Sequence, residues 1–229
     1  MDDSFDRAFE TMGLPWLPWV GIGYREAETK TLILGESIYA YGDGGETVRN
    51  RILEKQSLRQ RHMAHGILAN PKFKSAYLRN FERAVFLKKK PTGAQQKLLW
   101  SQVIFHNLVP RLLHSRRQRP TDEDYTNGWK IFLELAKVVQ PQRCLVYGLE
   151  SKKIDALMRL LDSPDTSHKI AQKKQRHAAI SGNRPITLSI LINGRRLDVL
   201  CMRHPSSFFS WDKWGLFLRE TDMMPVVLS

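Results

Sequence analysis

Short apolar runs that alternate with helical segments constrain the fold of this chain more than any other feature. Five runs combine leucine with β-branched residues and end at glycine, turn or polar residues, as buried strands do. They span residues 31–35, 103–105, 143–148, 186–192 and 197–202. Segments with apolar residues at helical spacing fill the gaps between them. This alternation predicts an α/β sheet with helices on both faces.

Local signals favour the same elements. The segment 121–124 resembles a capping box directly after Pro120, so a helix should begin there. Three helices are marked by apolar stripes that we interpret as core, within residues 73–85, 129–136 and 154–161. Asn193-Gly194 separates the last two strands and is typical of a tight hairpin turn, because both residues tolerate a positive φ.

Length and charge set further limits. The 229 residues predict a single domain, 1–229, with a sizeable core. The chain has 36 Lys and Arg residues against 23 Asp and Glu residues, a net charge of +13. Such an excess favours a nucleic-acid partner, although a basic protein without one remains an alternative. Basic residues form four groups, three of which lie just before or after a polar segment that could form a site. The groups are Lys88–Lys90; Arg111, His114, Arg116, Arg117 and Arg119; His168–His177; and Arg195, Arg196 and Arg203.

Residues 43–91 are unusual because they are long, mostly helical in pattern and basic. We interpret them as a helical insertion next to the site. Two roles stay open: a DNA clamp, or a peripheral subdomain with a solvated basic face. Its basic residues are Arg49, Arg51, Lys55, Arg59, Arg61, His62 and His65.

The sequence also predicts a compartment and an absence of cofactors. No apolar run approaches the length of a membrane span, and the N-terminus is acidic where a signal peptide would be basic. Cys144 and Cys201 lie in apolar runs, so we expect reduced buried thiols. Two cysteines cannot hold an iron–sulfur cluster or a zinc ribbon. We therefore expect a cytoplasmic monomer with no metal and no cofactor.

Three polar segments follow strand-like runs that lie far apart in the chain. They are Leu32–Ser37, Ile104–Asn107 and Arg203–Ser207. In open α/β sheets, ligands bind beyond the carboxyl ends of the strands. A carboxylate, an amide and an imidazole are therefore expected to share one site.

These segments carry a resemblance to the uracil-DNA glycosylase superfamily. The residues are Gly35-Glu36-Ser37-Ile38-Tyr39, then Asn107, then His204-Pro205-Ser206. Between the second and third motifs, Asn107-Leu108-Val109, a basic loop, Arg119-Pro120-Thr121 and Gln140-Pro141 are similar to the prokaryotic branch. The resemblance covers most of residues 14–218 without the insertion. Together with the alternation of elements, it implies a three-layer α/β/α sandwich with a central, mostly parallel four-stranded sheet.

The residue chemistry is consistent with hydrolysis of an N-glycosidic bond. Glu36 can orient water and offset positive charge on the sugar. Asn107 offers the donor and acceptor that match a pyrimidine edge, and a neutral His204 can donate to the departing base. Each residue also has a structural alternative: Glu36 as a helix cap or an arginine partner, Asn107 as a turn residue, and His204 as a loop residue.

The resemblance extends the site and leaves the base open. It adds Gly35 and Tyr39 to the base-binding set. DNA contacts are expected from Ser37, Ser206, Ser207, Arg116, Arg117, Arg119 and Phe208. The chain departs from the family at Ile38, where proline is usual, in its lack of four cluster-binding cysteines, and in the insertion. Either uracil or a modified cytosine is therefore an expected substrate, for DNA repair or antiphage defence.

We expect a monofunctional DNA glycosylase that leaves an abasic site, and two rivals stay open. A non-catalytic nucleic-acid-binding protein with the same fold would bind DNA without releasing a base. A metal-dependent nuclease would combine Glu36 with His106, His114 or His204 and make EDTA-sensitive cuts. No compact HxH or DxE cluster favours the nuclease.

Overall fold

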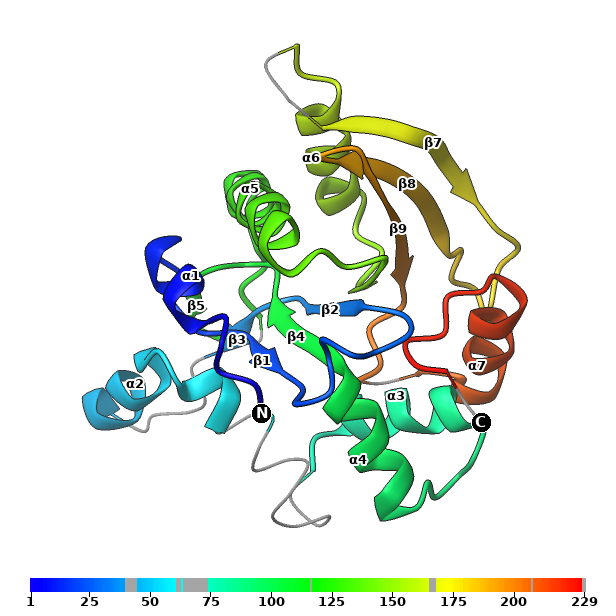
Figure 1. The fold of residues 1–229 in the computed structure, drawn as a ribbon, viewed down its shortest axis with the longest axis horizontal. Helices are drawn as coiled ribbons and strands as arrows, with labels where there is room; N and C mark the ends of the chain where they lie inside the picture. Colours follow the sequence, from blue (N-terminus) through cyan, green and yellow to red (C-terminus); the bar gives the residue numbers. More distant parts are fainter. Residues whose placement is uncertain are drawn as a thin grey trace.

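A central β-sheet organises the chain, as seen in a computed structural model that describes residues 1–39, 45–60, 63, 74–115, 117–164, 168–206 and 208–227. Within these residues the sheet has seven strands: β1 (Trp19–Val20), β2 (Thr31–Gly35), β4 (Val103–Asn107), β6 (Arg143–Tyr147), β7 (Lys169–Arg176), β8 (Ile186–Ile192) and β9 (Arg195–Met202). Their order is β1-β4-β2-β6-β9-β8-β7 (Figure 1). The four central strands, β4, β2, β6 and β9, are parallel. β1 at one edge, and β8 and β7 at the other, pair antiparallel.

The predicted α/β class is confirmed, but the predicted strand number of four is wrong. The added β7 carries the sequence KIAQKKQR, and nearly all of its residues are exposed. An edge strand of this kind is held by backbone pairing to one neighbour, so it shows no apolar alternation in the sequence. The turn between β8 and β9 is as predicted, with φ of 50° at Asn193 and 75° at Gly194.

Helices cover both faces of the sheet. They are α1 (Asp6–Thr11), α2 (Gly45–Leu53), α3 (Ala76–Phe86), α4 (Gly93–Gln102), α5 (Asp122–Val139), α6 (Ser151–Leu161) and α7 (Trp211–Glu220). α1, α5 and α6 contribute to one core cluster, whereas α3, α4 and α7 contribute to a second. Figure 1 shows the sheet passing between these two groups. Strand residues alternate between the clusters, with Val199 of β9 in the first and Leu200 in the second.

Helix α5 is fixed at its start and along its face. Thr121 accepts a hydrogen bond from the backbone N–H of Asp124, and the Asp124 carboxylate accepts one from Thr121, which completes the predicted capping box. At Gly128 an added Cβ would collide with the Leu108 carbonyl. This glycine therefore lets α5 approach the segment that follows β4.

The basic segment 43–91 is not a separate layer in its described parts. α3 packs into the second core cluster and contacts α7. Arg59 is 1% exposed, donates to the Pro18 carbonyl and pairs with Asp6 at 2.5 Å, so it does not belong to a solvated basic face. Arg49, Arg51 and Lys55 are exposed. Arg61, His62 and His65 lie outside the described residues.

A small second sheet ties the loops at the site together. β3 (Ile38–Tyr39) pairs in parallel with β5 (Leu112–Leu113). The backbone N–H groups of Leu108 and Val109 also donate to the carbonyls of Gly35 and Glu36. The segments after β2 and β4 are therefore held side by side. No described helix is long and apolar enough to cross a membrane, and both cysteines are buried and free.

Candidate active site

A cleft of about 850 Å³ opens at the carboxyl ends of the parallel strands, within the usual size range of ligand clefts. All three polar segments contribute to it. From these segments its lining takes Gly35, Glu36, Ser37, Phe105, Asn107, Arg203, His204 and Ser206, and β3 adds Ile38 and Tyr39. Residues after β6 and from α3 complete the walls. The structure therefore brings the expected carboxylate, amide and imidazole together.

Glu36 is a buried carboxylate, 7% exposed, one residue beyond β2. Its Oε1 accepts a hydrogen bond from the Tyr125 hydroxyl at 3.2 Å and lies 3.3 Å from the Lys153 ammonium. Its Oε2 lies 4.0 Å from Arg119, whose side chain is 73% exposed. Burial, followed by the nearby Glu36 charge, raises the pKa of Tyr125 above its usual value. Tyr125 therefore stays protonated and donates to Glu36.

Two charged residues of this site escaped the sequence analysis. Lys153 of α6 is 0% exposed, and its ammonium donates to Glu150 at 2.8 Å and to the Tyr147 carbonyl at 2.8 Å. Burial alone would raise the pKa of Glu150, but the charge and hydrogen bond of Lys153 hold it below the usual value. One signal was available: Lys153 precedes Leu157 by four residues, which places it on the apolar side of its helix.

Asn107 and Gly35 fit against each other in the cleft wall. They are register partners on β4 and β2, and Asn107 is 7% exposed. A Cβ on Gly35 would collide with the Asn107 Oδ1 atom. Glycine at this position therefore leaves room for the amide, because any side chain would displace it.

His204 is held as a neutral imidazole. Its Nδ1 accepts the backbone N–H of Ser206 at 3.2 Å, so the neutral ring carries its proton on Nε2. Burial lowers the pKa of His204 from 6.5 to about 4, although Glu36 opposes the shift. The rings of Tyr77 and Tyr147 pack edge-on against it at 6.0 and 5.6 Å. The ring is thus a hydrogen-bond donor near neutral pH.

The expected phosphate contacts differ in position. The Ser37 hydroxyl is buried and has no hydrogen-bond partner among the described residues, while Ser206 is exposed at the cleft. Arg119 lines the cleft, and Arg117 is exposed outside its lining. Arg116 and Ser207 lie outside the described residues.

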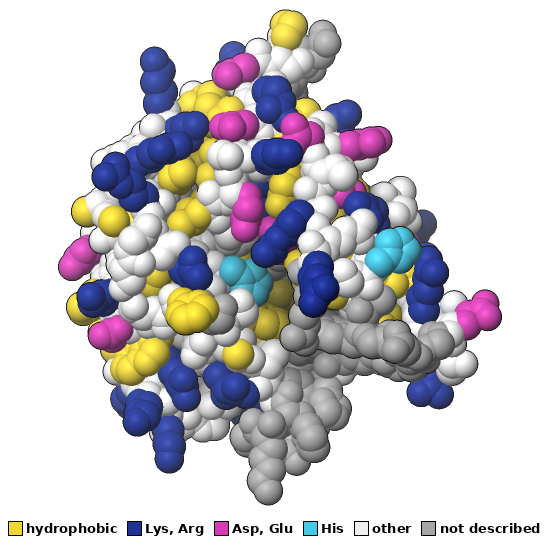
Figure 2. Space-filling model, turned by 180° about the vertical axis from the view of Figure 1, so that it is seen from behind, with side chains coloured by type: hydrophobic (Ala, Val, Ile, Leu, Met, Phe, Trp, Pro, Cys, Tyr) yellow, Lys and Arg dark blue, Asp and Glu magenta, His cyan; other side chains and the backbone are white. Residues whose placement is uncertain are grey.

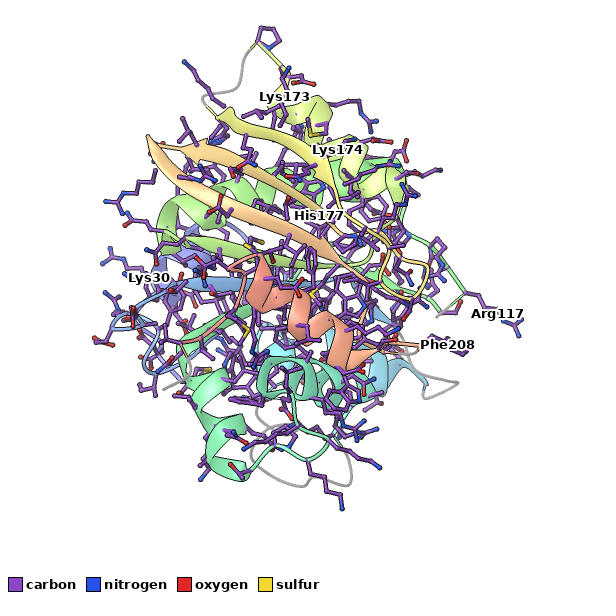
Figure 3. The ribbon with its side chains drawn as sticks, turned by 90° about the vertical axis from the view of Figure 1, so that its right-hand side faces the viewer. Lys30, Arg117, Lys173, Lys174, His177 and Phe208 are labelled. Carbon is purple, nitrogen blue, oxygen red and sulfur yellow. The ribbon has the colours of Figure 1, made fainter. Side chains whose placement is uncertain are left out.

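Phe208 is an exposed aromatic residue beside the cleft. It follows the Ser206 segment, is 89% exposed and has a φ of 50°, an uncommon conformation for a bulky residue. Its neighbour Phe209 instead stacks on Trp214 in the core at 5.8 Å. Figure 3 shows Phe208 and Arg117 projecting from the same side of the molecule. The geometry leaves Phe208 available for contact with a partner.

Positive charge is widespread on the described surface of the molecule. Figure 2 shows Lys and Arg side chains scattered over one face of the molecule, with fewer acidic side chains between them. Figure 3 shows Lys173 and Lys174 along β7. Arg111 is an exception within the basic loop, because both oxygens of Asp124 accept its hydrogen bonds. This ion pair fixes the loop to the start of α5 and removes Arg111 from the set of free cations.

Of the three histidines expected for a nuclease, His204 shares the cleft with Glu36, whereas His106 and His114 do not line it. His106 is adjacent to Asn107 on β4, so its side chain points to the opposite face of the sheet, and it is 2% exposed. His114 is exposed and does not line the cleft. Among the described residues, no group of three or more His, Cys, Asp or Glu side chains is placed to hold a metal ion.

Comparisons with known proteins add no family. No protein-family model matches the chain, and no curated protein matches it in sequence. The functional argument therefore depends on the cleft and its residues.

Proposed function

We propose that this protein is a monofunctional DNA glycosylase that flips a pyrimidine out of DNA and hydrolyses its N-glycosidic bond. One observation supports this most strongly: Glu36, Asn107 and a neutral His204 share one cleft at the ends of the parallel strands. In this proposal β4, β2, β6 and β9 are the four-stranded sheet of the glycosylase fold, with β1, β7 and β8 as additions.

The reaction adds one water and breaks one bond. As the bond between the sugar C1′ and the base nitrogen breaks, its electron pair goes to the base and positive charge develops on the sugar. The Glu36 carboxylate offsets that charge and orients the water whose oxygen bonds to C1′. His204 donates a hydrogen bond to the departing base anion, and this bond strengthens as negative charge develops on the base. The proton lost by the water ends on the free base, and the DNA keeps an abasic site.

The remaining contacts select and hold the nucleotide. Asn107 pairs with the edge of the base, next to Gly35 and Tyr39. Ser37, Ser206 and Arg119 contact the flanking phosphates, and Phe208 fills the gap left in the duplex. The cleft has room for a base larger than uracil, since its volume is about 850 Å³. Uracil and a modified cytosine are therefore both proposed substrates.

Base release is the direct test. Single- and double-stranded oligonucleotides would carry uracil, a thymine mismatch, 5-hydroxymethylcytosine or its glucosylated form, and mass spectrometry would identify the released base. We expect the native protein to release one free base, and the rate of release to fall by roughly 100- to 10,000-fold in Glu36→Gln. Glu134→Gln is the matched control, since that glutamate is exposed, pairs with Lys137 and does not line the cleft.

Three outcomes would contradict the proposal. DNA binding without release from any substrate would favour a non-catalytic binding protein. EDTA-sensitive strand cuts without alkali would favour a nuclease. Release that is equally fast in Glu36→Gln and the native protein would remove the carboxylate from the mechanism.

A further inference from the structure

A buried lysine connects two carboxylates at the cleft. The Lys153 ammonium lies 2.8 Å from Glu150 Oε2 and 3.3 Å from Glu36 Oε1, and it also donates to the Tyr147 carbonyl. Lysine is almost never fully buried unless it is paired. Both acidic partners line the cleft, whereas Lys153 does not. The cation therefore lies behind the cleft wall and contacts the acids that form it.

Glu36 has few other charged or titratable neighbours among the described residues. Tyr125 of α5 donates to it, and Arg119 of the preceding loop lies 4.0 Å away but is 73% exposed. Solvent screens an exposed charge of that kind. His204 faces it as a neutral ring. Lys153 is therefore the close, buried cation for Glu36.

We propose that Lys153 is the positioning residue for Glu36, and that Glu150 limits its effect by sharing the same ammonium. The inference depends on the proposed glycosylase function for its catalytic meaning. Lys153 places a positive charge beside Glu36 and holds Oε1 in the direction in which the carboxylate orients water. Glu150, whose side chain is 43% exposed, draws part of that charge toward the solvent side of the cleft.

Lys153 acts through Glu36 and not as a nucleophile. An ammonium has three donors and no lone pair. Two of them are directed to Glu150 and the Tyr147 carbonyl, and Glu36 Oε1 lies 3.3 Å from the same nitrogen. A lysine in this state does not attack a sugar carbon, so borohydride should trap no covalent complex with DNA. A trapped complex that disappears in Lys153→Met would overturn the assignment.

The pair can be tested without any activity. In Lys153→Met, Glu36 becomes a buried charge without its close cation, so neutralising it in Glu36→Gln/Lys153→Met should raise the melting temperature above that of Lys153→Met. In the native background, Glu36→Gln should give no such increase. Equal effects of Glu36→Gln in both backgrounds would show that the two residues do not interact.

A matched lysine controls for loss of charge on the same helix. Lys152 is adjacent and 71% exposed, and its acidic neighbour among the described residues is Asp122 at 3.8 Å. In Lys152→Met, Glu36→Gln should act as it does in the native protein. If Lys153→Met does not fold, Glu150→Gln replaces it: Lys153 then pairs with Glu36 alone, so Glu36→Gln should lower the melting temperature more than it does in the native protein, and an equal effect would overturn the pairing.

The catalytic meaning is tested by the pH dependence of uracil release from single-stranded DNA. In Lys153→Met we expect the rate of uracil release at pH 7 to fall about 100-fold. We also expect the acid limb of its pH–rate profile to move to higher pH. Glu150→Gln should move it to lower pH, because Lys153 then serves Glu36 alone. A purely structural lysine predicts that Glu150→Gln moves the limb equally in the native and the Lys153→Met backgrounds, and that result would overturn the proposal. If the native protein releases no base, the proposed function fails, while the melting experiment still decides whether Lys153 and Glu36 are coupled.

Discussion

Acidification to pH 5.5 should leave His204 neutral, and this can be checked at the ring itself. Burial lowers the pKa of His204 from 6.5 to about 4, and its Nδ1 already accepts the Ser206 N–H. The difference corresponds to about 3 kcal/mol in favour of the neutral ring. At pH 5.5 an ordinary histidine would be about 90% protonated, whereas His204 should be only about 3% protonated.

The assay combines NMR and kinetics. Carbon-13 labelling of histidine Cε1 gives one titration curve per ring, and the signal missing in His204→Gln identifies His204. We expect its midpoint near pH 4. The single-turnover rate of base release should not fall tenfold between pH 7 and 5.5, as it would if protonation of an ordinary histidine stopped the reaction. In His204→Ala the same rate should fall by roughly 100- to 1,000-fold.

Two results would refute this reasoning. A His204 midpoint near 6.5 would mean that the ring is solvated and that the packing by Tyr77 and Tyr147 does not exclude water. Native-like release by His204→Ala would mean that the ring donates nothing to the departing base. His177→Ala is a control for general histidine effects, since that ring bonds Thr187 outside the cleft.

Gly35, Phe208 and His106 can each be tested by one substitution. Gly35→Ala should displace the Asn107 amide, because the added Cβ would collide with it. We expect kcat/KM for base release to fall by at least about tenfold while cooperative unfolding is retained, and unchanged kinetics would contradict this contact. Phe208→Ala should weaken duplex binding by about 1–3 kcal/mol, measured by titration, while the melting temperature stays constant because the ring is 89% exposed; equal binding would remove it from the interface. His106→Leu should reduce the loss of unfolding free energy in acid. Burial, followed by the charge of Arg59, lowers the pKa of His106 to about 4. Because the unfolded chain takes up the proton first, the native protein should lose about 2 kcal/mol of unfolding free energy at this residue between pH 7 and 5. Denaturant melts at both pH values would measure it, and a parallel decline in the variant would refute it.

The positions of the cleft segments could be predicted because strand ends carry a strong local signal. Gly35 and Asn107 end apolar runs, and parallel strands present their carboxyl ends at one edge. Turn chemistry predicted the β8–β9 hairpin in the same way. The signal fails where a strand lacks an apolar face, as in β7, whose lysines and glutamines resemble a solvated loop.

Charged residues were the hardest to place from the sequence. Arg59 belongs to a basic segment, yet it is buried against Asp6 and the Pro18 carbonyl. Lys152 and Lys153 are identical neighbours, yet one is 71% exposed and the other fully buried. Their difference arises from how α6 packs on the sheet, which depends on contacts between distant segments. Composition counts such residues as surface charge and therefore overestimates the number of free cations at the surface.

The charges of the cleft also imply a direction for the substrate. Glu36 and Glu150 share a single ammonium, and these three groups together carry a net negative charge. The neutral His204 offers a donor but no charge. In the proposed reaction the sugar becomes positive and the base negative, so the sugar fits beside Glu36 and the base beside Asn107 and His204. The reverse orientation would bring the base anion against the carboxylates, and repulsion between like charges disfavours it.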